Sequence, residues 1–85
     1  MIIQNSLYTL KFPSRKTEIT IPSKQDLSLF TQILTAAQIN YKTLANDSLS
    51  VNLTAPKLKN VLLSVASNPF TQALKADLAM CAQIW

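Results

Sequence analysis

Apolar and polar residues alternate along two short stretches near the start of the chain, residues 8–12 and residues 17–21. A period of two is the signature of a β-strand with one buried face, so both stretches predict strands. Residues 13–16 between them contain no glycine, which favours a loop of four or five residues built on a type I turn. Pro22 ends the second stretch. The chain is therefore expected to begin with a β-hairpin.

A helical period replaces this alternation from Ser23 onward. Ser23 is the expected N-cap, and the carboxylate of Asp26 stands where a capping box has its acidic residue. The apolar residues that then recur at spacings of three and four are Leu27, Phe30, Ile33, Leu34 and Ala37. A single apolar stripe of this kind predicts a helix that covers a sheet.

The second half of the chain repeats the order of strand, strand and helix. Residues 39–44 and 49–53 suit strands, and an Asn-Asp pair between them supplies turn chemistry for a second hairpin. Helices are expected over residues 54–67, with Thr54 as N-cap, and over residues 70–83, after an Asn-Pro start. The apolar stripe of the first of these helices consists of Leu58, Val61, Leu62 and Val65.

These elements predict a single α+β domain over residues 1–85. We expect two layers: a four-stranded, mainly antiparallel sheet in the order ββαββαα, with the helices on one face. The residues expected on the other, polar face are Thr9, Lys11, Glu18, Thr20, Asn40, Lys42, Ser50 and Asn52. A β-grasp-like fold is the alternative, because such folds also begin with a hairpin followed by a helix.

Composition limits the class of protein. Hydrophobic residues make up 48% of the chain and charged residues 14%, which is typical of a folded domain rather than a disordered segment. The single cysteine, Cys81, has no intramolecular disulfide partner, which favours a reducing compartment. The sequence shows no secretory-signal pattern and no apolar run near the roughly 18 residues that a membrane span needs. We therefore expect a cytoplasmic protein without a membrane partner.

Two missing residue types limit the chemistry. Without glycine there is no phosphate-binding glycine loop, and without histidine there is neither a Ser-His-Asp or Cys-His pair nor enough ligands for a zinc site. The four carboxylates, Glu18, Asp26, Asp47 and Asp77, follow no recognisable catalytic spacing. We expect no enzyme, no cofactor and no metal. An enzyme that uses carboxylates or Cys81 would need two of these groups together in a pocket.

The last helix is the first candidate binding surface. Its apolar arc is too wide for one contact, and Asp77 lies near the middle of the arc. The residues predicted for a partner-protein or homodimer interface are Phe70, Leu74, Asp77, Leu78, Met80, Cys81, Ile84 and Trp85. The alternative is that the helix is buried in the core, with Asp77 paired to a lysine, a tyrosine hydroxyl or a backbone cap.

Basic residues are the second candidate surface, because the net charge is +4. The residues predicted to bind an anion or nucleic acid are Lys11, Arg15, Lys16, Lys24, Lys57 and Lys59. The alternative is ordinary solvated charge. RNA-binding sheets normally expose several aromatic side chains, and the tyrosines expected in strands here are Tyr8 and Tyr41, either of which could face the core.

The sequence therefore predicts a non-enzymatic protein-binding module, an inhibitor or adaptor that acts on a larger assembly or forms a homodimer. Docking is expected through the last helix or by strand addition at an exposed sheet edge. A small nucleic-acid-binding protein is the alternative function.

Overall fold

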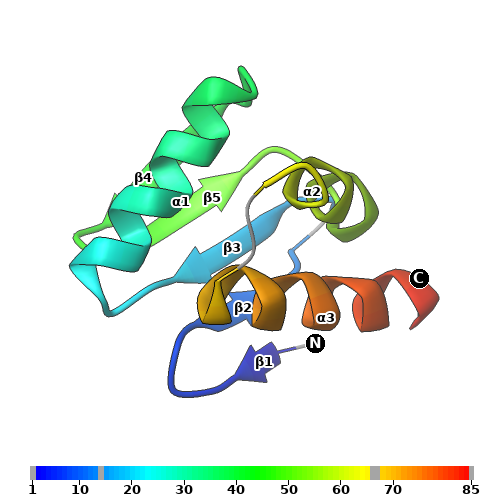
Figure 1. Cartoon of the computed structure of the whole chain (residues 1–85). Helices are drawn as coiled ribbons and strands as arrows, with labels where there is room; N and C mark the ends of the chain where they lie inside the picture. The colour runs from blue at the N-terminus through cyan, green and yellow to red at the C-terminus, as the bar shows by residue number, and fades with distance from the viewer. Residues whose placement is uncertain (1, 14, 66–67, 85) are drawn as a thin grey trace.

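The computed structural model describes residues 2–13, 15–65 and 68–84, with side chains up to Cys81 in the last helix. Three strands, a helix, two strands and two helices follow one another along the chain (Figure 1). Their bounds are β1 (Ile2–Gln4), β2 (Thr9–Lys11), β3 (Thr17–Thr20), α1 (Lys24–Ala36), β4 (Tyr41–Ala45), β5 (Ser48–Val51), α2 (Ala55–Leu62) and α3 (Pro69–Ile84). The α+β class is confirmed, but the sheet has five strands rather than four.

The strand that the sequence did not reveal is β1. It has three residues, which is too short for a visible alternation, and it pairs with β2 through Ile3 opposite Leu10. The turn between them is held by Asn5, whose Oδ1 accepts the backbone N–H groups of Leu7 at 2.8 Å and Tyr8 at 3.0 Å. Asparagine favours such turns because its side chain can bond to the backbone two or three residues on.

The strands lie in the order β1-β2-β3-β5-β4, and every pairing is antiparallel. Because β5 lies between β3 and β4, these two outer neighbours run in the same direction, and α1 carries the chain from one to the other. The β-grasp alternative is wrong, since the central strands of that fold pair in parallel. The two edges of the sheet are β1 and β4.

The turn between β2 and β3 differs from the predicted type I turn. The N–H of Lys16 donates to the carbonyl of Pro13 at 3.1 Å, and Arg15 has a φ of 66°. A type I turn keeps φ negative at this third position, whereas a positive value there belongs to other turn types. The five residues between β2 and β3 agree with the predicted loop length, but the turn type was wrong because the prediction assumed that only glycine or asparagine would take a positive φ.

Side-chain caps begin α1 and α3 where the sequence predicts, whereas Thr54 occupies the N-cap position of α2 without a side-chain cap hydrogen bond. Ser23 caps α1 by accepting the N–H of Asp26 at 3.4 Å. Asn68 and Thr71 cap α3 reciprocally, because each side chain accepts the other residue's N–H at 2.9 Å. Helix α2 ends at Leu62 rather than near residue 67, before a serine and a β-branched valine that are weaker helix formers.

All three helices cover one face of the sheet (Figure 1). Helix α3 packs against α2, and the ring of Phe70 forms T-shaped pairs with the rings of Tyr8 and Phe30, at centroid distances of 5.9 and 6.3 Å. The core side chains come from the sheet and from every helix: Tyr8, Leu10, Ile19, Ile21, Phe30, Ile33, Leu34, Leu49, Val51, Ala55, Leu58, Leu62, Phe70, Leu74, Leu78 and Cys81. None of the described helices is long and apolar enough to span a membrane.

Candidate functional site

Most of the described residues predicted for an interface on α3 lie inside the molecule. Phe70, Leu74, Leu78 and Cys81 are buried, so they offer no surface to a partner while this fold is intact. Met80 is 56% exposed, whereas the side chains of Ile84 and Trp85 lie outside the described residues. The wide apolar arc has a structural cause: α3 contacts α2 as well as the core beneath it.

Asp77 accepts a hydrogen bond from the hydroxyl of Tyr8, one of the pairings predicted for it. The side-chain amide of Asn5 donates to the same oxygen at 3.5 Å. Burial raises the pKa of Tyr8, and its hydrogen bond to the Asp77 carboxylate raises it further, so the hydroxyl remains a proton donor. Burial also raises the pKa of Cys81, which disfavours a reactive thiolate there. This cluster joins α3 to the β1-β2 turn.

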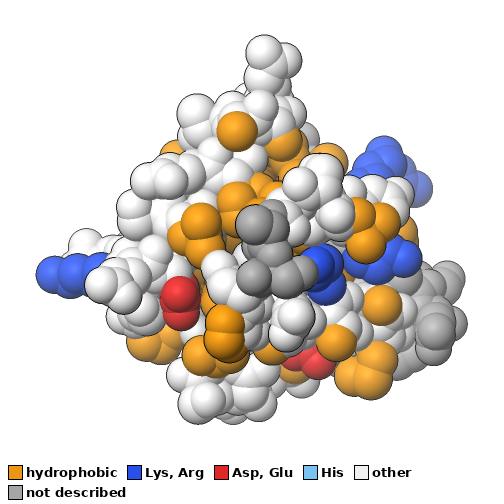
Figure 2. Space-filling model, viewed as in Figure 1, with side chains coloured by type: hydrophobic (Ala, Val, Ile, Leu, Met, Phe, Trp, Pro, Cys, Tyr) orange, Lys and Arg blue, Asp and Glu red, His pale blue; other side chains and the backbone are white. Residues whose placement is uncertain are grey.

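The predicted basic residues are divided between the two sides of the molecule. Lys11 lies on the face of the sheet opposite the helices, which we call the open face, and Lys16 directly precedes β3. Lys24 belongs to α1, and Lys57 and Lys59 belong to α2. Arg15 lies in the turn between β2 and β3. On the helix side, cationic side chains are spread over several places rather than joined in one patch (Figure 2). The fold therefore does not bring the predicted set together.

Strand β4 is the most exposed element of the sheet. All five of its residues are exposed, including Tyr41 at 38% and Leu44 at 48%. One side of β4 pairs with β5 and the other side has no neighbouring strand among the described residues. An unpaired edge presents a row of backbone donors and acceptors to solvent.

The register shows which backbone groups point outward from this edge. The N–H of Asn52 donates to the carbonyl of Asn40 at 3.4 Å, which makes these residues a hydrogen-bonded pair of the antiparallel ladder. Such pairs alternate with pairs that are not bonded, so Lys42 directs its backbone groups toward β5. Tyr41 and Thr43 direct theirs away from the sheet. These outward groups are free to bond an added strand.

A register shift between Thr43 and Ala45 limits the regular part of this edge. A bulge of this kind twists a strand and interrupts pairing, and it is one of the devices that protect edges from unwanted strand addition. The regular part that remains is Asn40 to Thr43. We call this segment the β4 edge.

A hollow of about 260 Å³ lies beside the β4 edge, and we call it the basic pocket. It is lined by Lys16, Asn40, Tyr41, Lys42, Ser50 and Asn52. Alternation along β4 and β5 puts the asparagines, Lys42 and Ser50 on the open face of the sheet. No carboxylate lines the pocket, and neither lysine makes an ion pair within the described part of the chain. The pocket suits a negatively charged group.

From the sequence, Lys42 was predicted only as a polar-face residue, and Lys16 only as one of six basic residues that could bind an anion. They come together because β3 pairs with β5 and β5 pairs with β4. The signal that could have revealed the pocket is a set of four polar residues on one face of the hairpin: Lys42 lies opposite Ser50, and Asn40 lies opposite Asn52. Using that signal would have required knowing that β5 also pairs with β3 on its other side.

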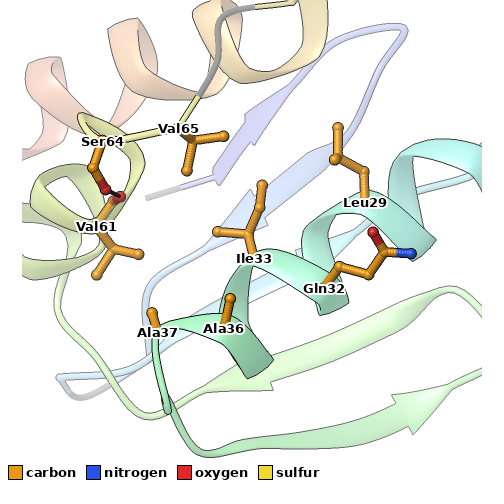
Figure 3. A pocket seen from close by; sticks show the side chains of 8 residues that line it. All are labelled: Leu29, Gln32, Ile33, Ala36, Ala37, Val61, Ser64 and Val65. Carbon is orange, nitrogen blue, oxygen red and sulfur yellow. Dashed lines mark hydrogen bonds between the residues drawn. The ribbon is translucent and has the colours of Figure 1, made fainter.

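A second hollow, of about 370 Å³, lies between α1 and the end of α2. Its lining consists of Leu29, Gln32, Ile33, Ala36, Ala37, Val61, Ser64 and Val65 (Figure 3). Figure 3 shows Ile33, Val61 and Val65 facing the same space. The lining is mainly apolar, without a charged group to orient a ligand. We call it the helix groove, and it has fewer specific features than the basic pocket.

Groups suited to catalysis do not gather in these hollows. Among the described residues there is no cluster of three or more His, Cys, Asp or Glu side chains that could hold a metal ion. Neither Tyr8 nor Asp77 lines the basic pocket or the helix groove. Comparison of the chain with models of protein families, with curated proteins and with solved structures finds no match.

Proposed function

We propose that this chain is a non-enzymatic protein-binding module that takes up an extended segment of another protein at the β4 edge. In strand addition, main-chain hydrogen bonds supply affinity and side-chain pockets supply specificity. The observation that supports the proposal is the exposed β4 edge with the basic pocket directly beside it. Capture of a segment from a larger assembly would make the protein an inhibitor or an adaptor.

The opposite edge of the sheet is a poorer candidate. Strand β1 has only three residues, and the basic pocket lies at the other edge of the sheet. Its outward backbone groups belong to Ile2 and Gln4, because Asn5 donates to the carbonyl of Tyr8 and so fixes the alternation. The β1 edge therefore serves as an internal comparison for the β4 edge.

A second copy of the chain fits the β4 edge less well than a different protein does. Residues 41–45 contain a lysine and no carboxylate, so two copies paired through β4 would bring cations together without anions. The net charge of +4 on each copy adds to this repulsion. Homodimer formation through β4 is accordingly an outcome of the tests rather than the proposal.

Nucleic-acid binding is disfavoured by the placement of the tyrosines. Tyr8 is buried, and Tyr41 pairs with Val51, a core residue, which puts its side chain on the helix side of the sheet. The open face therefore lacks an aromatic platform in the described strands. Stacking of bases on such a platform is what single-stranded nucleic acids normally require from a sheet.

The test compares two proline substitutions at equivalent edge positions. Thr43→Pro removes an outward N–H from β4, and Gln4→Pro removes an outward N–H from β1; proline is tolerated on edge strands where that N–H faces solvent. Tagged wild-type and variant proteins are used to capture proteins from an extract of the cells that express the chain, followed by crosslinking and mass spectrometry. We expect a stoichiometric partner that wild type and Gln4→Pro retain and that Thr43→Pro loses. A partner set that is the same for all three proteins, or empty for all three, contradicts the proposal.

A further inference from the structure

We infer that the segment bound at the β4 edge is acidic and places an aspartate or glutamate side chain opposite Lys42, where the basic pocket recognises its carboxylate. This inference rests on the proposed function, because it specifies the chemistry of the strand that β4 accepts. Two observations support the inference: the register of the sheet and the positive charge of the pocket lining.

The register fixes how close such a side chain comes. An added strand bonds to the outward groups of Tyr41 and Thr43, so the position opposite Lys42 is a non-hydrogen-bonded pair across the new edge. In antiparallel pairs these positions have the closer Cα separation, about 4.5 Å, and their side chains approach most directly. Lys42 points to the open face, so its partner side chain does too. A carboxylate at this position is therefore within reach of the Lys42 ammonium group.

The rest of the lining can add donors to the same carboxylate. Asn40 lies two residues before Lys42 on the same face and can contribute an amide N–H group, whereas Lys16 lies on the far side of β5 and adds only longer-range positive charge. Glu18 is the nearest acidic residue by register: it lies opposite Ser50, which lies opposite Lys42. Two strand spacings therefore separate Glu18 from Lys42, roughly 10 Å, or about one Debye length at moderate ionic strength. The incoming carboxylate lies one spacing from Lys42, so attraction dominates.

The other face of the added strand meets a different environment. Residues opposite Tyr41 and Thr43 point to the helix side, where the partly exposed ring of Tyr41 offers apolar surface. We therefore expect the segment to alternate between acidic and apolar residues over the length of the β4 edge. Because that length is short, the buried area stays below the roughly 1,200 Å² typical of stable complexes, and the complex is transient.

The experiment selects binding sequences from a displayed library of short random peptides. Selections are run in parallel against wild type, Lys42→Glu, Thr43→Pro and Tyr41→Pro, with Lys24→Glu as a charge-matched control away from the basic pocket. The affinities of the selected peptides are then measured by fluorescence anisotropy at two salt concentrations, and a single-stranded oligonucleotide is measured beside them. Circular dichroism tests whether each variant is folded. If Thr43→Pro does not fold, Tyr41→Pro serves as the edge variant in its place.

We expect wild type and Lys24→Glu to enrich peptides with aspartate or glutamate at alternate positions. Lys42→Glu should lower the affinity for these peptides by roughly three- to tenfold, in line with the loss of a solvent-exposed ion pair. Selection on this variant should enrich peptides with lysine or arginine instead. The proline variants should lose both classes of peptide.

Other results would distinguish a failure of the acidic-segment inference from a failure of the proposed strand addition. Peptides that lack acidic residues but are lost in the proline variants would overturn the inference and leave strand addition intact. Binding that the proline variants retain, or no enrichment at all, would overturn both. Salt-dependent binding of the oligonucleotide that is tighter than that of any peptide would also overturn both, because the pocket would then serve a phosphate backbone.

Discussion

The hydroxyl of Tyr8 and the carboxylate of Asp77 connect positions far apart in sequence through one hydrogen bond inside a largely apolar region. Tyr8 is buried, and a buried polar group without a partner costs about 1–3 kcal/mol, so its hydroxyl requires the Asp77 carboxylate. This pair explains why a carboxylate is tolerated on the apolar side of α3. It also ties the last helix to the β1-β2 turn, through Asn5 as well as through Tyr8.

This pair predicts a loss of stability at alkaline pH. In the unfolded chain Tyr8 ionises near the ordinary pKa of about 10, whereas the folded structure raises the pKa of Tyr8 and keeps it protonated. The stability that depends on protonated Tyr8 is therefore complete below pH 10 and falls as the pH rises above it, with a slope of up to about 1.4 kcal/mol per unit. Urea unfolding of wild type and Tyr8→Phe on either side of that pH checks this. The variant should show a flatter dependence, and equal slopes would contradict the assignment.

The left-handed conformation of Gln38 leads to a second prediction about stability. It follows α1 with a φ of 58°, and the N–H groups of Gln38 and Ile39 bond to the carbonyls of Thr35 at 3.1 Å and Leu34 at 2.9 Å. This is a Schellman motif, in which glycine is the preferred residue at the left-handed position. Gln38→Gly should therefore raise the free energy of unfolding, by about 0.5–1 kcal/mol after the entropy of the unfolded chain is counted.

The matched control for Gln38→Gly is Gln32→Gly, in the interior of α1. Glycine there lacks the left-handed requirement and should lower stability by about 1 kcal/mol. Thermal unfolding followed by circular dichroism measures both variants. A destabilised Gln38→Gly protein would show that the end of α1 does not have this conformation in solution.

Helix α3 provides the test at the scale of an element, because it is either core or interface. Leu74 is fully buried and Met80 is 56% exposed on the same helix. Leu74→Ala should lower the free energy of unfolding by about 2–5 kcal/mol through lost burial and a residual cavity. Met80→Ala should change it by less than about 0.5 kcal/mol. Similar values for the two variants in chemical unfolding would mean that α3 is not packed as described.

Elements with a strong local signal could be predicted from the sequence, and weakly marked ones could not. Helix α1 has a cap at Ser23 and a full apolar stripe, and its start was predicted within a residue. Strand β1 was missed because three residues cannot display a period. The apolar arc of α3 was visible, but the sequence could not show that α2 would cover part of it. Sequence spacing gives the width of an apolar face and leaves its contacts undetermined.

The candidate site depends on long-range pairing, which local patterns do not encode. Lys16 and Lys42 line one pocket because β5 is inserted between β3 and β4. Alternation alone correctly placed Lys42 and Ser50 on the polar face, yet it gave no neighbour for either residue. Only the order of strands in the sheet reveals the pocket.

At the scale of the whole molecule, the two sides of the sheet have separate roles. The helix side holds the core, and its cations are spread out (Figure 2). The open side is polar and ends at the β4 edge, where backbone groups without a neighbouring strand lie beside a pocket without carboxylates. This arrangement supports the proposal that the molecule presents one edge of its sheet to an acidic, extended partner segment.

Backbone amide hydrogen exchange, measured by NMR with and without a peptide selected on the wild-type protein, tests this account most directly. Strand addition should slow exchange at the amides of Tyr41 and Thr43, which point away from the sheet in the free protein. The amides of Ile2 and Gln4 at the β1 edge should not change. Unchanged exchange at Tyr41 and Thr43, with protection appearing instead around the helix groove at Ile33 and Val65, would contradict it.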